Sequence, residues 1–543
     1  MKQRIIAFGC CFLVLIGCST KQQVDLIVHN AQVYTVDSAF TQVQAFAVKD
    51  GNIVALGSDS AILAAYASDS MLNAQQQFIY PGFIDGHAHF VGYGQGLFQV
   101  SLFGMNSWKV IVDSVQAFAV RHPQETWIRG RGWDQNLFAD KQYPDNSLLN
   151  QLFPDKPVLL TRVDGHAAIA NAKALALAGI TPSTTLVGGA VETKNGVLTG
   201  VLIDNAVDLV TAKIPAATAA DYEKWLLAAQ RNCVAMGLTT ITDCGLMYND
   251  VAQIDALHKA NKLQQRLYVM LSDDTANYNR YLAKGPYVTD RLWVKGIKVY
   301  ADGALGSRGA CLLKHYADKP GWFGFLLKDE KYFDSLANVL VKTDFQMCTH
   351  AIGDSANRTV LKIYEKYLQG KNDKRWRIEH AQVVAASDFY LFGNNSVVPS
   401  VQPTHATSDM YWAENRLGKE RMAGAYAYQQ LLQQNGWLSL GTDFPVEDIS
   451  PFKTFLAAVY RVDAQQYPGG GFQANNALTP EQALRGMTIW AAKANRIEQE
   501  VGSLEVGKRA DFLLLPKNLL TTPPNALLQL AVTATYINGI KVH

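Results

Sequence analysis

The sequence has 543 residues, of which 48% are hydrophobic and 18% charged, and it contains no low-complexity tract. This composition is typical of a globular protein and excludes a disordered or fibrous chain, while the length favours one large domain with an accessory domain. Lys and Arg number 49 against 47 Asp and Glu, and no Arg/Lys runs occur, so nothing in the charge pattern indicates nucleic acid as a partner.

The N-terminus has the features of a secretory signal peptide over residues 1–17. A short basic start is followed by an apolar run and then by small residues. Leu15-Ile16-Gly17-Cys18 resembles the lipobox of bacterial lipoproteins, which predicts cleavage before Cys18 and lipid attachment to that residue. By the same resemblance, Ser19 favours an outer-membrane location facing the periplasm. A plain cleaved signal peptide and a short membrane anchor are the alternatives.

Short strands separated by turns are predicted at both ends of the mature chain. Residues 18–80 and residues 491–543 both contain brief apolar segments bounded by turn residues such as Gly, Asn and Asp. Neither end has enough strands for a core of its own. We therefore expect the two ends to pack together as one small β-sandwich.

Residues 81–490 alternate apolar strands with amphipathic helices, the pattern of an α/β protein with a parallel sheet. Eight strands are predicted, at 79–87, 238–243, 266–271, 293–300, 346–350, 375–380, 397–402 and 437–443. Eight strands close a barrel, so the predicted fold is a (β/α)8 TIM barrel. The connection between the first two strands is far longer than a βα loop requires, which indicates an insertion over the barrel mouth at about residues 92–220.

Potential metal ligands fall at the C-terminal ends of five of these strands. His87 and His89 follow the first strand, two positions apart and therefore on one face of an extended segment. The others stand at the ends of the fourth, fifth, sixth and eighth strands: Lys298, His350, His380 and Asp443. Taken singly, each is more often a packing, surface or capping residue. Because the strand ends of a barrel converge on one mouth, the set together predicts a metal centre.

These motifs resemble the amidohydrolase superfamily along the whole barrel. Pro81-Gly82-Phe83-Ile84-Asp85-Gly86-His87-Ala88-His89 matches the first-strand motif of that superfamily. Residues 298–308, 350–354 and 441–447 resemble its YtcJ-like branch, amidohydrolase family 3, which includes N-substituted formamide deformylases. Residues 502–511 resemble the return of the chain into the β-sandwich. The resemblance implies a hydrolase that uses one or two divalent ions.

The resemblance also implies a role for each ligand. His87, His89 and Asp443 would hold the more buried ion, His350 and His380 the more exposed one, and Lys298, carboxylated by CO2, would bridge them. Imidazole and carboxylate ligands suit Zn2+ or a similar ion. Metal-activated water would attack a carbonyl carbon, and Asp443 would pass the proton to the leaving nitrogen. Without carboxylation a mononuclear site is expected, with Lys298 as a positioning charge.

Further residues are predicted to contact the substrate: Trp133, His166, Asp302, Arg308, Gln402 and His405. Trp133 and His166 belong to motifs of the insertion that resemble a substrate cap, and the indole offers a flat apolar wall. His166 either hydrogen-bonds the substrate or pins the inserted module. Asp302 and Arg308 either recognise a polar end of the substrate or form an ion pair with each other.

The predicted activity is hydrolysis of a carbon–nitrogen bond, other than a peptide bond, in an amide, N-formyl group or cyclic amide. Ester or carbamate hydrolysis at the same site is one alternative, and a non-catalytic, lipid-tethered protein that binds a metal or small ligand is another. The complete ligand set, with Asp443 as a proton shuttle, favours catalysis. The predicted partners are a small-molecule substrate and, through the lipid, a membrane; a homodimer and a disulfide stay open.

Overall fold

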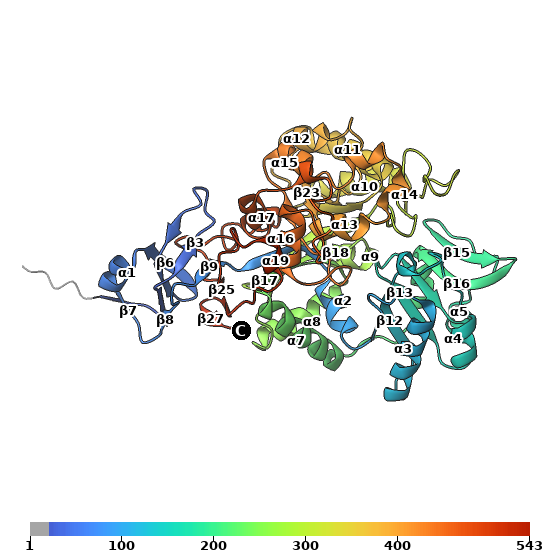
Figure 1. Ribbon diagram of the computed structural model, residues 1–543, viewed down its shortest axis with the longest axis horizontal. Coiled ribbons are helices and arrows are strands. Elements are labelled where there is room, and N and C mark those ends of the chain that lie inside the picture. The colour runs from blue at the N-terminus through green and yellow to red at the C-terminus, as the bar shows by residue number, and fades with distance from the viewer. Residues whose placement is uncertain (1–20) are drawn as a thin grey trace, which may run out of the picture.

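The computed structural model describes residues 21–543, so the predicted signal peptide and Cys18 lie outside the described residues. Figure 1 shows three parts: a β-sandwich at the left, a barrel in the centre and an inserted α/β module at the lower right. Across residues 21–543, no helix combines the length and the apolar character that a bilayer crossing requires. The cysteines of this range are free thiols: Cys233, Cys244, Cys311 and Cys348.

Eight parallel strands form the barrel and follow one another in chain order around it. They are β10 (Phe83–Ala88), β17 (Leu238–Leu246), β18 (Arg266–Ser272), β20 (Leu292–Tyr300), β21 (Gln346–Ala351), β22 (Arg377–His380), β23 (Val398–Val401) and β24 (Ser439–Leu440). The ends of the first and last strands meet through two backbone bonds. The Asp443 amide donates to the His87 carbonyl at 2.7 Å, and the His89 amide donates to the Phe444 carbonyl at 2.8 Å. The predicted (β/α)8 fold is confirmed.

Amphipathic helices cover the outside of the barrel. The main ones are α2 (Phe90–Gly96), α7 (Ala219–Ala235), α8 (Tyr248–Lys259), α9 (Thr275–Tyr281), α10 (Glu330–Leu340), α11 (Asp354–Leu368), α12 (Tyr390–Asn394), α13 (Pro403–Asp409), α15 (Tyr428–Asn435), α16 (Pro451–Val459), α17 (Pro480–Gly486) and α18 (Ile489–Ala494). In α10 the buried residues are Phe333, Leu336, Ala337 and Leu340. Their spacing of three and four places one apolar stripe against the strands.

The predicted first strand, residues 79–87, is divided between two sheets. Its first part, β9 (Phe78–Pro81), pairs with β25 (Phe512–Leu515) in the sandwich, while β10 belongs to the barrel. Gly82 lies between them, and a Cβ at this position would stand 2.3 Å from the side chain of Thr239. Only glycine therefore allows the chain to pass so close to β17 as it leaves one sheet for the other.

Both ends of the chain build the sandwich. One sheet has the order β6-β5-β2-β8 and the other β27-β26-β25-β9-β3-β4. Besides β9 and β25, these sheets contain β2 (Leu26–His29), β3 (Gln32–Tyr34), β4 (Gln42–Val43), β5 (Ala45–Lys49), β6 (Asn52–Gly57), β8 (Met71–Asn73), β26 (Ala534–Ile537) and β27 (Ile540–Lys541). Phe46 packs edge-on against Phe512 with ring centres 5.1 Å apart. The two ends share one core, as predicted.

The inserted module lies between α2 and α7 and has a sheet of its own, in the order β11-β12-β13-β14-β16-β15. Its strands are β11 (Val100–Ser101), β12 (Ile128–Trp133), β13 (Val158–Arg162), β14 (Ala167–Ala170), β15 (Gly189–Lys194) and β16 (Val197–Asp204), and its helices are α3 (Trp108–Arg121), α4 (Ser147–Leu152), α5 (Ala172–Ala178) and α6 (Asn205–Thr211). Side chains from α3 and from the strands form its core, including Ile111, Ile128 and Leu160. A module with its own core can present side chains to the barrel mouth as a rigid unit.

Candidate active site

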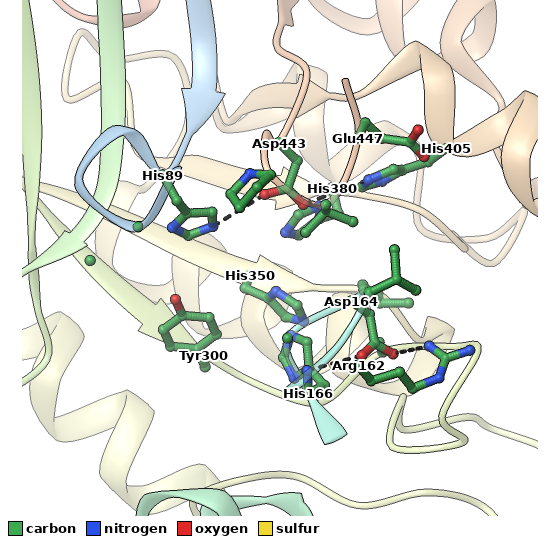
Figure 2. A pocket seen from close by; sticks show the side chains of 18 of the residues that line it. His89, Arg162, Asp164, His166, Tyr300, His350, His380, His405, Asp443 and Glu447 are labelled. Atoms are coloured by element: carbon green, nitrogen blue, oxygen red, sulfur yellow. Dashed lines mark hydrogen bonds and ion pairs between the residues drawn. The ribbon is translucent and has the colours of Figure 1, made fainter. Parts of the chain in front are cut away.

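A cavity of about 1180 Å³ lies at the C-terminal ends of the barrel strands, lined both by the barrel and by the inserted module. Figure 2 shows two facing rows of side chains across it. One row contains His89, Asp443, His380 and His405, and the other contains Tyr300, His350 and His166. The predicted convergence of distant strand ends therefore produces a concave site of the kind that binds small molecules.

His87, His89 and Asp443 form the first group of potential metal ligands, with their ligand atoms within 4.8 Å of one another. His89 Nε2 lies 3.1 Å from Asp443 Oδ1, and His87 Nε2 lies 3.6 Å from the same oxygen. Within the described part of the chain, this buried oxygen has no hydrogen-bond partner. A buried carboxylate oxygen facing two imidazole nitrogens is the donor set of a divalent metal site.

Asp85 fixes the position of the group formed by His87, His89 and Asp443. Its Oδ1 accepts the backbone N–H groups of His87 at 3.1 Å and Thr442 at 3.0 Å, and its Oδ2 accepts the Thr442 hydroxyl at 2.7 Å. Burial raises the pKa of Asp85 to about 7. The residue thereby joins the segments that carry His87 and Asp443. Asp443 itself has a φ of +62°, a conformation that is costly for a non-glycine residue and characteristic of functional sites.

A second group shares Asp443 and adds His380 and His405. His405 Nε2 lies 3.6 Å from Asp443 Oδ2 and has no hydrogen-bond partner within residues 21–543. His380 Nδ1 lies 2.8 Å from Gln402 Oε1. Because the amide oxygen accepts the Nδ1–H, Nε2 of His380 keeps the lone pair that a metal requires.

The composition of this second group differs from the expected one. His350 lies outside both three-residue groups, although its ring centre is 4.5 Å from that of His380. Its Nε2 is buried without a hydrogen bond in the described residues and lies 3.7 Å from Asp302 Oδ1. His405 completes this group instead, because α13 begins at Pro403 directly after β23 and brings that imidazole close to Asp443.

Lys298 is 1% exposed, and its Nζ lies 3.1 Å from His87 Nε2. The Tyr300 ring lies 4.9 Å from the same nitrogen. An ammonium group has no lone pair, so Lys298 in this form donates to His87 and does not bind a metal. The structure thus places Lys298 beside the other potential ligands, at the position predicted from the sequence.

The protonation states of the ligands suit a metal. Burial lowers the pKa of His89 to about 4, and it also lowers the pKa values of His87, His350 and His380. Burial alone would raise the pKa of Asp443, but the imidazoles around it, His87 foremost, hold that pKa well below its ordinary value. Neutral imidazoles and an ionised carboxylate at pH 7 are the forms that bind divalent ions. The residues present therefore fit the metal that the sequence resemblance implies.

Glu379 is a site residue that the sequence analysis missed. His87 Nδ1 donates to Glu379 Oε2 at 2.5 Å, and neither side chain is exposed. Glu379 stands in β22, a strand whose four residues are all buried. An acidic residue in a fully buried strand requires a polar or charged partner. That requirement was the signal in the sequence that could have identified Glu379 as a site residue.

Of the predicted substrate contacts, His166 and His405 line the cavity. The expectation for Trp133 is corrected. Its indole is fully buried in the core of the inserted module and donates to the Leu160 carbonyl at 2.7 Å. In a regular strand Arg131 and Trp133 would share one face, but a register shift in β12 lies between them. Trp133 therefore turns into the core of the module, while Arg131 faces the cavity.

The remaining three contacts are also corrected, because none of them lines the cavity. Asp302 is fully buried and accepts the backbone amides of Cys311, Ile352 and Gly353, which holds the loop after β20. Arg308 pairs with Asp318 at 2.9 Å and not with Asp302. Gln402 lies behind His380, whose ring it orients.

Comparisons with known proteins identify the family of this chain. A model of the amidohydrolase family matches residues 71–543. The putative amidohydrolase YtcJ of Bacillus subtilis is 31% identical over 526 residues, covering 95% of this chain and 98% of that protein. The N-substituted formamide deformylase of Arthrobacter pascens is 26% identical over 548 residues, covering 96% and 98%. An uncharacterized metal-dependent hydrolase from Pyrococcus horikoshii superimposes with a TM-score of 0.76 at 25% identity, covering 92% of this chain and 99% of that one. The chain therefore belongs to the amidohydrolase family and is a metal-dependent hydrolase.

Proposed function

We propose that the protein hydrolyses a C–N bond of a small amide, N-formyl or cyclic amide substrate, with zinc as its metal. The observation that carries the proposal is the pair of ligand groups that share Asp443 at the wall of a large cavity. The similarity to a formamide deformylase along nearly the whole of both chains supports a nitrogen leaving group.

Each residue of the site has its own proposed role. His87, His89 and Asp443 would hold one ion, and His380 with His405 or His350 a second. Lys298, which adjoins His87, joins the ligand set once CO2 has converted its amine to a carbamate, because only then does it offer oxygen lone pairs. When bound, the metal supplies Lewis acidity and a water molecule that ionises near neutral pH.

Asp443 moves the proton. Its carboxylate lies 3.1 Å from His89 Nε2 and 3.6 Å from His405 Nε2, within the wall of the cavity. There it accepts the proton of the attacking water and delivers it to the departing nitrogen, as general base and then general acid. Residues of the inserted module line the other side of the cavity, where they would limit the access of bulk water.

A substrate panel tests this proposal. Zinc-loaded protein is assayed against N-formyl amines, N-acyl amines and lactams, beside matched esters and carbamates. We expect turnover of amides that is abolished by Asp443→Asn and retained by Asp448→Asn, the same substitution at an exposed position of the cavity rim, where Asp448 pairs with Lys453. Turnover of esters alone favours the first alternative, and metal binding without any turnover favours a binding protein.

We also propose that the mature protein is lipid-anchored through Cys18 in the cell envelope, at the outer membrane facing the periplasm. The lipobox-like residues before Cys18 and the Ser19 after it support this location. Labelling of cells with a palmitate analogue tests it: the wild type should incorporate label and sediment with membranes, whereas Cys18→Ser should do neither. Unlabelled, soluble wild-type protein contradicts the proposal.

A further inference from the structure

Arg131 and Arg162 both line the cavity, and their surroundings differ. Arg162 has acceptors on several sides: it pairs with Asp134 and Asp164, each at 2.5 Å, and donates to Gln135 Oε1 at 2.7 Å. Arg131 makes one hydrogen bond, from Nη2 to the Val163 carbonyl at 3.1 Å. Its Nε is buried without a partner, and within residues 21–543 no carboxylate pairs with it.

The turn between β13 and β14 holds the Arg131 guanidinium in place. Gly165 in this turn has a φ of +78°, and a Cβ there would stand 3.1 Å from Arg131 Nη2. Asp164, the nearest acidic residue of the turn, is already occupied by Arg162 and by the backbone N–H of His166 at 3.0 Å. The backbone thus supports the guanidinium from one side, and within residues 21–543 its other N–H groups have no acceptor.

The position of Arg131 relates it to the catalytic centre. It lines the cavity together with His166, His350 and Asp443, on the wall that the inserted module supplies. An arginine stays charged at every physiological pH, and a partly buried charge without a partner is costly unless a ligand provides the counter-charge. The protein therefore maintains an unsatisfied cation opposite its metal ligands.

The other cationic side chains that line the cavity already have partners. Lys453 pairs with Asp448 at 2.8 Å, and Lys298 belongs to the metal centre. Lys328 lies over the ring of Tyr332, with Nζ 5.6 Å from its centre. Among the described lining residues, Arg131 is thus the cation best placed to receive an anionic group.

We propose that Arg131 binds a carboxylate of the substrate, so that the amide cleaved at the metal centre carries a carboxylate substituent. The inference rests on the proposed function and narrows its substrate class. The planar guanidinium matches a carboxylate through two parallel N–H to oxygen bonds, a fit that lysine does not offer. Anionic substrates enter with this group toward the inserted module and the amide toward Asp443.

Binding of uncleavable probes tests Arg131 directly. Zinc-loaded protein is titrated by calorimetry with 4-phenylbutyrate and with 4-phenylbutanol, which differ in the carboxylate and contain no amide. We expect Arg131→Gln to weaken binding of the acid about 10- to 100-fold and to leave binding of the alcohol unchanged. Arg131→Lys should fall between the two. Arg129→Gln, the same change on the same strand but away from the cavity, should alter neither.

Kinetics separates failure of this inference from failure of the proposed function. The matched substrates are N-formylphenylalanine and N-formyl-2-phenylethylamine, which differ in the carboxylate alone. Arg131→Gln should raise KM for the acid and leave kcat/KM for the neutral amide unchanged. Equal losses on both substrates, or unchanged binding of 4-phenylbutyrate, overturn the role of Arg131. If neither amide is cleaved, the proposed function fails, while the calorimetric titration still decides whether Arg131 binds a carboxylate.

Discussion

Replacement of Glu379 tests how the buried carboxylate behind His87 prepares that imidazole for a metal. His87 Nδ1–H donates to Glu379 Oε2 at 2.5 Å, and both side chains are fully buried. With the proton held on Nδ1, Nε2 keeps its lone pair on the side of Asp443, whose Oδ1 is 3.6 Å away. Glu379 therefore selects the tautomer and ring orientation that a metal ligand requires.

The size of the effect follows from what each substitution removes. Glu379→Gln keeps an acceptor beside Nδ1 but removes the charge, whereas Glu379→Ala removes both and leaves the buried N–H without a partner. Hydrogen bonds to charged groups contribute about 1.5–3 kcal/mol, and loss of the carboxylate behind a metal-binding histidine costs about 10- to 100-fold in metal affinity. We expect Zn2+ to bind about tenfold more weakly to the Gln variant and about a hundredfold more weakly to the Ala variant.

Competition with a chromogenic chelator at fixed pH measures these affinities, and circular dichroism confirms that each variant is folded. Glu365→Gln is the matched control, because Glu365 pairs with Lys362 at 3.0 Å on the exposed face of α11. It should bind zinc like the wild type. A folded Glu379→Ala protein that retains wild-type zinc affinity would refute the role assigned to the buried carboxylate.

Three further outcomes are expected. Removal of the metal by a chelator should abolish activity and lower the melting temperature, and adding zinc should restore both. The reason is that a metal at a thousand times its Kd stabilises the folded state by about 4 kcal/mol. An unchanged melting temperature contradicts the metal site. Burial lowers the pKa of His258 to about 4, below its value in the unfolded chain, so the stability that this neutral histidine confers is present above about pH 6.5 and declines toward pH 4. Between pH 7 and 5 the wild type should lose at most about 2 kcal/mol more than His258→Gln in urea denaturation, and parallel losses contradict the assignment. Gly82→Ala, whose Cβ would stand 2.3 Å from Thr239, should cost about 1–3 kcal/mol, and Thr239→Gly in the same chain should recover part of that loss in the same assay.

The order of elements and the ligand positions were predictable from the sequence because both depend on local patterns. Alternating strands and helices, eight strand segments and a long gap after the first specify the barrel and its insertion. His87, His89 and Asp443 stand at strand ends, and the topology alone brings such ends together. One continuous strand over residues 79–87 was a wrong prediction, since a uniform apolar run does not reveal where one sheet passes to another.

Tertiary packing decided which side chains meet across these elements. Glu379 behind His87, and His405 in place of His350 in the ligand group of His380 and Asp443, depend on ring and helix orientations that no local spacing encodes. Trp133 and Arg131 are two positions apart in one motif, yet the former is core and the latter faces the cavity. The sequence thus determines which residues stand at the barrel mouth, because strand order and period are local properties. Their partners are set by the packing of the inserted module against the barrel, because burial and pairing depend on residues that are distant in the chain.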